Sequence, residues 1–291
     1  MYQLFMSFEN PTEAFSGKKQ TVQGFAVYGD EGFILYHTGV CAVYDLRARD
    51  SAPRAVFRLG SYNEGTPDNR YTNHANDAMF GAVRAGEQYP LLYVTAGNSG
   101  DCDEKGYIAY CAVEQIRQRE GVFTSETVQR IYYRDDGAEQ TSFCSPGWGW
   151  PASLVDVEGG WYYMLSARYR TKRSLYRPDN AYIVTKFRLP APDVPEIFLT
   201  PADIVDQFAL PFEAFFTQGG TVRDGKIYYM FGCGNEDHPN RMNVIDLAKK
   251  DYALCEDLSG ESFHAEEVEC CAFYGDRLLI NAQGGHIYER I

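Results

Sequence analysis

The sequence predicts an all-β fold built from a repeated unit of antiparallel strands, and three observations predict it. Aromatic residues make up 15% of the chain, and 27 glycines separate the segments that contain them, a composition typical of sheets joined by turns. Helical periodicity is missing over any stretch longer than about ten residues, apart from residues 200–209. One unit can also be followed in full from Thr217 to Leu247: strand, tight Asp224-Gly225 turn, aromatic strand, glycine-rich loop, strand.

This unit recurs along the chain, and each recurrence is expected to form one sheet. In the third repeat the fourth strand is weak and is assigned to Glu196–Leu199. Insertions at residues 60–73 and 134–150 leave room for a further partial unit. The alignment of Tyr28-Gly-Asp30 with Tyr274-Gly-Asp276 nevertheless favours a count of five. The expected repeats cover residues 21–60, 74–134, 150–200, 216–258 and 267–291.

The last repeat contains three strands, because the chain ends at Ile291. Tyr2–Phe8, at the other end, reads as a strand with no partner in its own repeat. Pairing the two would close a ring and remove an exposed sheet edge. This pattern resembles the β-propeller superfamily, whose blades are four-stranded sheets and whose termini often share a blade. The resemblance covers residues 1–291 as a single domain, without a WD dipeptide, kelch pair or Asp-box to name a particular family.

Composition limits the classes of partner. A net charge of −13 argues against a nucleic-acid-binding surface, which needs clustered Lys and Arg. No run approaches the roughly 20 apolar residues of a membrane span, and the N-terminus lacks the features of a signal peptide. The expectation is a cytoplasmic monomer or weak oligomer without a cofactor. The eight cysteines show no CxxC spacing, and reduced thiols are expected.

The resemblance implies that the first strand of each blade lines a central channel, with its starting end at one mouth. Side chains alternate along a strand, so aligned positions nominate the residues that face this channel. A one-residue slip would instead turn Asp77 and Glu266 inward. Polar residues are concentrated at the start of these strands. The aligned positions hold Gln23, Asn76, Pro151, Gln218 and Glu269, and two residues earlier Thr21, His74, Gly149, Phe216 and Glu267.

His74 together with Glu267 and Glu269 is the candidate catalytic set. An imidazole facing two carboxylates could carry out acid–base chemistry or hold a divalent cation. Because no second histidine occupies an equivalent position, no metal is expected. The alternative for Gln23, Asn76, Gln218 and Thr21 is structural, since buried amides and hydroxyls often bind neighbouring backbone or water.

Loops expected on the same face add further candidates. The segment 166–173 is basic in an acidic chain, and Arg168 and Arg170 are candidates for binding an anionic group; the alternative is surface ion pairing of little energetic value. Trp150 could stack on a sugar ring or pack between blades. The other loops expected on this face are His37–Gly39, Gly97–Asp101, Gly232–His238 and Gln283–Gly285.

These residues favour a non-catalytic propeller that binds a small polar or carbohydrate-type ligand, which could be anionic, at the channel mouth. One alternative is a glycoside hydrolase or polysaccharide lyase that uses the His/Glu set. A protein–protein interaction platform is the second alternative. The sequence contains no G-x-S-x-G motif, and its glycine pairs lie between strands, so hydrolase-elbow and nucleotide-loop chemistry are excluded.

Overall fold

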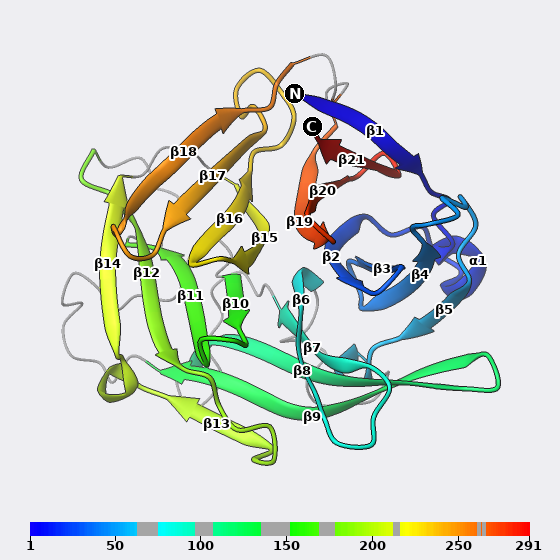
Figure 1. Ribbon diagram of the computed structural model, residues 1–291, viewed down its shortest axis with the longest axis horizontal. Coiled ribbons are helices and arrows are strands. Elements are labelled where there is room, and N and C mark those ends of the chain that lie inside the picture. Colours follow the sequence, from blue (N-terminus) through cyan, green and yellow to red (C-terminus); the bar gives the residue numbers. More distant parts are fainter. Residues whose placement is uncertain are drawn as a thin grey trace.

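A computed structural model places five sheets around a common centre, so the chain is an all-β, five-bladed β-propeller, as predicted (Figure 1). The innermost strands of neighbouring sheets contact one another around the ring. The structure describes residues 1–62, 75–96, 107–134, 152–168, 178–211, 216–260, 263 and 266–291.

The first two blades follow the predicted pattern, in which successive antiparallel strands lead from the centre to the rim. The first blade consists of β2 (Val22–Tyr28), β3 (Glu31–Tyr36), β4 (Val40–Asp45) and β5 (Ala55–Arg58). The second consists of β6 (Ala75–Val83), β7 (Pro90–Ala96), β8 (Tyr107–Arg119) and β9 (Val122–Arg134). Short helices flank the first blade, α1 (Thr12–Ser16) before it and the 3₁₀ turn η1 (Gly60–Tyr62) after it.

The other three blades repeat the arrangement. The third contains β10 (Ala152–Asp156), β11 (Trp161–Ala167), β12 (Ala181–Arg188) and β14 (Asp206–Pro211). The fourth contains β15 (Thr217–Arg223), β16 (Lys226–Phe231), β17 (Arg241–Asp246) and β18 (Asp251–Asp257). The fifth contains β19 (Val268–Tyr274), β20 (Arg277–Ala282), β21 (His286–Arg290) and, from the other end of the chain, β1 (Tyr2–Ser7).

The third blade departs from the sequence prediction at its outer strand. The segment assigned to that position, β13 (Glu196–Leu199), pairs in parallel with β9 of the second blade, where Phe198 stacks on Tyr132 at 5.1 Å. The 3₁₀ turn η3 (Pro201–Asp203) follows, and the Asp203 carboxylate accepts hydrogen bonds from the backbone N–H and hydroxyl of Thr200. This capped corner separates β13 from β14, so the two segments join different sheets. Residues 200–209 are therefore this turn and a strand, and the helical periodicity noted there was misleading.

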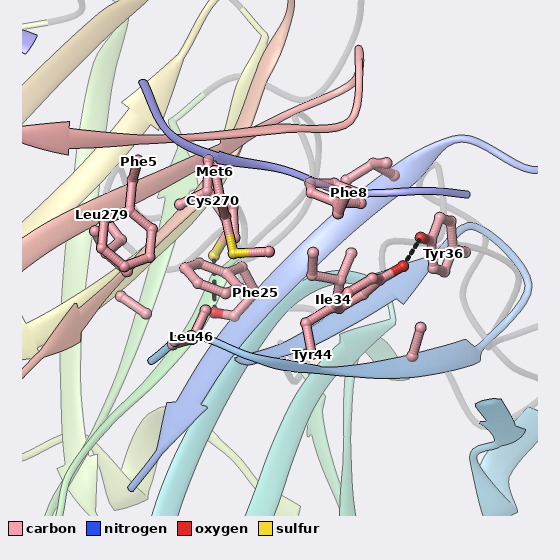
Figure 2. Packing of buried hydrophobic residues seen from close by; sticks show 14 of the residues in the cluster. Phe5, Met6, Phe8, Phe25, Ile34, Tyr36, Tyr44, Leu46, Cys270 and Leu279 are labelled. Atoms are coloured by element: carbon pink, nitrogen blue, oxygen red, sulfur yellow. Dashed lines mark hydrogen bonds between the residues drawn. The ribbon is translucent and has the colours of Figure 1, made fainter. Parts of the chain in front are cut away.

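The N-terminal strand closes the ring. β1 pairs antiparallel with β21, with Tyr2 opposite Arg290 and Ser7 opposite His286. The register shifts between Leu4 and Met6, which lets the consecutive residues Phe5 and Met6 both be buried. Figure 2 shows them packed in one cluster with residues of the first and fifth blades, among them Phe25, Ile34, Cys270 and Leu279. β1 thus joins the last blade to the first.

Local predictions about turns and thiols can also be compared with the structure. The Asp224-Gly225 turn has positive φ at both residues, 50° and 69°, as expected for the tight hairpin turn that the dipeptide favours. Of the cysteines in the described ranges, all are free, including the adjacent Cys270 and Cys271. No helix in the described part of the chain is long and apolar enough to cross a membrane.

Candidate functional site

Four inner strands carry a β-bulge close to their starting end. The register shifts between Val22 and Phe25 in β2, between Ala75 and Asp77 in β6, between Thr217 and Gly220 in β15, and between Val268 and Cys270 in β19. A bulge interrupts the alternation of side chains, because two residues of one strand oppose a single residue of its partner. The simple alternation assumed from the sequence therefore fails at this mouth.

The bulges surround a pocket of about 360 Å³ at one mouth of the channel, within the size range of ligand sites. Seven residues at the aligned positions nominated from the sequence, including Phe216, line it together. His74, Trp150 and Arg170 lie outside the described residues, and Arg168 is not among the lining residues; its guanidinium donates to the carbonyl of Asp179 at 2.9 Å. The pocket is lined by Thr21, Gln23, Asn76, Gln218, Glu267 and Glu269, together with His37, Phe216, Thr217 and Gln283.

Hydrogen bonds fix the position of the Glu267 carboxylate. Nε2 of Gln218 donates to Oε1 of Glu267 at 2.7 Å and also to the carbonyl of Gly232 at 2.9 Å. Nε2 of Gln283 donates to Oε2 of Glu267 at 2.7 Å. The carboxylate is therefore held by amides from two blades, and its hydrogen-bonding capacity is largely used within the protein.

Glu269 and Gln23 differ from Glu267, because each has an acceptor atom without a partner. Their side chains are 1% and 3% exposed. Oε1 of Glu269 and Oε1 of Gln23 form no hydrogen bond with any residue that the structure describes. Buried acceptors normally have a partner, since leaving one unsatisfied costs roughly 1–3 kcal/mol. Both side chains line the pocket, so a ligand held there could supply the missing donors.

The pKa values of three titratable side chains that line the pocket are shifted in the direction that favours the neutral form. Burial raises the pKa of Glu269 well above its ordinary value, and the neighbouring charge of Glu267 raises it further, although a hydrogen bond from Gln283 opposes the shift. Burial also raises the pKa of Glu267, although hydrogen bonds from Gln218 and Cys233 oppose the shift. The pKa of His37 is lowered, mainly by burial and in addition by Lys18. The pocket thus combines a carboxylic acid that favours its protonated form with a neighbouring carboxylate and an imidazole.

Deeper in the channel, Asp77 occupies a fully buried position. Its Oδ1 accepts hydrogen bonds from the Gly220 N–H at 3.2 Å and from the Cys270 thiol at 3.3 Å. Burial raises the Asp77 pKa to about 7, against the effect of these hydrogen bonds. Its Oδ2 has no partner among the described residues. Asp77 therefore joins the inner strands of three blades.

The alternative register considered from the sequence, shifted by one residue, predicts that Asp77 and Glu266 face the channel. The structure agrees for Asp77 and not for Glu266. Asp77 is inside the channel, although its neighbour Asn76 lines the mouth pocket, because the bulge in β6 lies at this point. Glu266 is engaged elsewhere: its Oε1 lies 2.6 Å from Nδ1 of His286, and its Oε2 accepts from the N–H of Gly284 at 3.2 Å. One residue from each of the two alternative registers, Asn76 from the first and Asp77 from the slipped one, therefore faces inward in β6.

Three lining residues were not nominated from the sequence, namely His37, Thr217 and Gln283. His37 and Gln283 belong to loops that were expected on this face, so a search of those loops for titratable and amide side chains would have found them. Thr217 is the first residue of β15, and only the bulge that follows it explains its place beside Gln218. The ligand-binding roles of the lining residues stay predictions.

No metal site is evident within the ranges that the structure describes, where no three His, Cys, Asp or Glu side chains gather suitably for a metal ion. The triad of His74, Glu267 and Glu269 is not tested by this result, because His74 lies outside the described residues. Within the described set, His37 is the histidine that lines the pocket with the two carboxylates.

Of the comparisons with known proteins, the one with solved structures bears on the fold. No family model matches the chain, and no curated protein does either. Among solved structures, the crystal structure of Myxococcus xanthus glutaminyl cyclase is similar, with a TM-score of 0.51 at 13% identity. The similarity covers 99% of this chain and 94% of the other. It extends over the whole propeller, and at this identity it supports the fold alone.

Proposed function

We propose that the protein binds a small polar, hydroxyl-rich ligand, such as a saccharide unit, in the mouth pocket. The observation that carries the proposal is a pair of buried acceptors that have no partner among the residues the structure describes, Oε1 of Glu269 and Oε1 of Gln23. A ligand hydroxyl can donate to each of them. The protonated form of Glu269 can in turn donate to a ligand oxygen.

Phe216 supplies an apolar surface beside these polar groups. Its side chain is 45% exposed although it lines the pocket, and its φ of 59° lies in the left-handed region. That conformation is costly for a bulky residue and is enriched at functional sites. His238 packs edge-on against the ring at 4.6 Å. An exposed ring next to hydrogen-bonding side chains suits a sugar, which presents C–H groups and hydroxyls on different faces.

The test is a binding survey with neutral mono- and oligosaccharides, using thermal shift first and isothermal titration calorimetry for each hit. Gln23→Leu and Phe216→Ala should each weaken binding by about tenfold or more, in line with the loss of one buried hydrogen bond or one ring contact. Phe198→Ala is the matched control, because this exposed ring lies on β13, outside the pocket. Equal affinities in all three variants would contradict the proposal, as would a complete failure of the survey.

Acid–base catalysis at the same pocket is the second candidate. The observation in its favour is the raised pKa of Glu269 beside Glu267, since two coupled carboxyl groups can divide the roles of acid and base. Saccharide hits should therefore be tested for cleavage. Because the similar structure is a glutaminyl cyclase, cyclisation of a glutaminyl peptide belongs among the assays. Turnover by the wild type that is abolished in Glu269→Gln would replace the binding proposal with catalysis.

A further inference from the structure

A second pocket, of about 490 Å³, adjoins the mouth pocket and has the opposite electrostatic character. The two pockets share Thr21 and His37. The second pocket has no carboxylate among its lining residues and collects three permanent cations, and we call it the basic pocket. It is lined by Ser16, Lys18, Lys19, Gln20, Thr21, His37, Thr38 and Arg58.

The three cations are not neutralised by ion pairs within the described part of the chain. No salt bridge there involves Lys18, Lys19 or Arg58. The chain as a whole is acidic, with 27 Lys and Arg against 40 Asp and Glu side chains, so a pocket lined by three cations and no carboxylate stands out. Other described arginines, such as Arg54 and Arg117, pair with carboxylates. The pKa of His37 is lowered first by burial and then by the positive charge of Lys18.

Hydrogen bonds hold the walls of the basic pocket in place. Gly17, with a φ of 74°, caps the C-terminal end of α1, and Lys18 and Lys19 follow it directly. The Gln20 backbone N–H donates to the Thr12 hydroxyl at 2.9 Å, and Oε1 of Gln20 accepts from the Thr38 N–H at 3.1 Å. Nη1 of Arg58 donates to the carbonyl of Thr38 at 3.0 Å. This bond orients the guanidinium, whose other N–H groups have no acceptor among the residues that the structure describes.

We propose that the basic pocket is a subsite for an anionic substituent, a phosphate or a carboxylate, carried by the ligand of the mouth pocket. The inference rests on the proposed function, because it names the class of ligand: a polar molecule with hydroxyls at one end and an anionic group at the other. Arginine and lysine side chains that converge on one pocket bind such oxyanions through charge-assisted hydrogen bonds. The opposite characters of the two pockets would fix the orientation of the ligand.

The direct test uses inorganic phosphate, measured by calorimetry at low ionic strength, with acetate as a parallel probe. The double variant Lys18→Ala/Lys19→Ala should weaken phosphate binding by about tenfold, and raising the salt concentration should weaken wild-type binding. The matched control is Lys249→Ala/Lys250→Ala, which removes another adjacent lysine pair, located in the turn before β18. Arg58→Gln should weaken phosphate binding by a similar factor. Because Arg58 lies on β5, this result would show that the lysine variant does not act only by disturbing its own loop.

Phosphate binding that is undetectable, or that falls equally in the two lysine variants, would overturn the subsite. Acetate that binds as well as phosphate, with the same dependence on Lys18 and Lys19, would assign a carboxylate-type ligand; tighter phosphate binding would assign a phosphorylated one. Gln23→Leu separates this proposal from the proposed function, since it should impair saccharide binding and leave phosphate binding unchanged. If the saccharide survey fails while phosphate binding depends on the lysine pair, the subsite stands and the saccharide ligand is wrong.

Discussion

Nε2 of Gln218 lies 2.7 Å from Oε1 of Glu267, so an amide on the inner strand of the fourth blade donates to a carboxylate just before the inner strand of the fifth. The bond crosses the mouth pocket from one blade to the next. It links the shape of the pocket to the packing of the fourth blade against the fifth.

We expect a measurable coupling between these two residues. A double-mutant cycle of Gln218→Ala and Glu267→Ala, analysed by chemical denaturation, should give an interaction free energy of about 1–2 kcal/mol. Gln218 and Gln283 both donate to Glu267, so a cycle of Glu267→Ala with Gln283→Ala provides the comparison. A coupling free energy near zero in the first cycle would show that the bond does not stabilise the folded state.

The fully buried Asp77 should make stability depend on pH. Its pKa is about 7 in the folded protein and roughly 4 in an unfolded chain. Since the folded state favours the protonated form, stability falls as pH rises from about 4 to 7, by an amount on the order of 4 kcal/mol at most. Asp77→Asn removes this titration, so its stability relative to wild type should increase over that pH range and level off above it. Denaturation at pH 5 and pH 8 measures the difference.

The control for the loss of one charge is Asp193→Asn, at an exposed position. If the free energy of unfolding of Asp77→Asn relative to wild type were the same at pH 5 and pH 8, the expectation would be contradicted.

Closure of the ring by β1 can be tested at two adjacent residues. Phe5 is 3% exposed and packs between the first and fifth blades, whereas Leu4 is 53% exposed. Phe5→Ala should therefore lower the free energy of unfolding by about 3–5 kcal/mol, while Leu4→Ala should change it by about 0.5 kcal/mol or less.

Deletion of residues 1–9 should lower the melting temperature more than either substitution, because it exposes the edge of β21. Scanning calorimetry measures all three proteins. A deletion variant with an unchanged melting temperature would show that β1 contributes nothing to closure.

The close approach of the inner strands should make Gly219 intolerant of a larger residue. A Cβ atom there would lie 2.5 Å from Sγ of Cys270 and 3.0 Å from Oδ1 of Asp77. Gly219→Ala should destabilise the protein by about 1–3 kcal/mol, the usual cost of overpacking. Gly260→Ala is the matched control, since nothing lies within 4 Å of its added Cβ. Equal stabilities of the two variants by denaturant titration would contradict the tight contact at the axis.

The sequence by itself determined the all-β class, the five repeats and the pairing of the Tyr2–Phe8 segment with the last blade, because each depends on a pattern repeated along the chain. It also nominated Gln23, Asn76, Gln218 and Glu269 as neighbours at one mouth, since aligned positions in a closed ring must meet. The Asp224-Gly225 turn was readable for a local reason, the ease with which these residues adopt positive φ.

Only the tertiary structure decided where the alternation of side chains fails. The bulge in β6 lies between Ala75 and Asp77, where Asn76 lines the mouth pocket and Asp77 is fully buried, and a period of two along one strand does not reveal such a register shift. The same holds for β13, whose partner β9 belongs to the preceding blade. The basic pocket combines the lysine pair that precedes the first blade with Arg58 from the outer strand of that blade. Residues so far apart in sequence meet because the fold, and no local pattern, brings their backbones together.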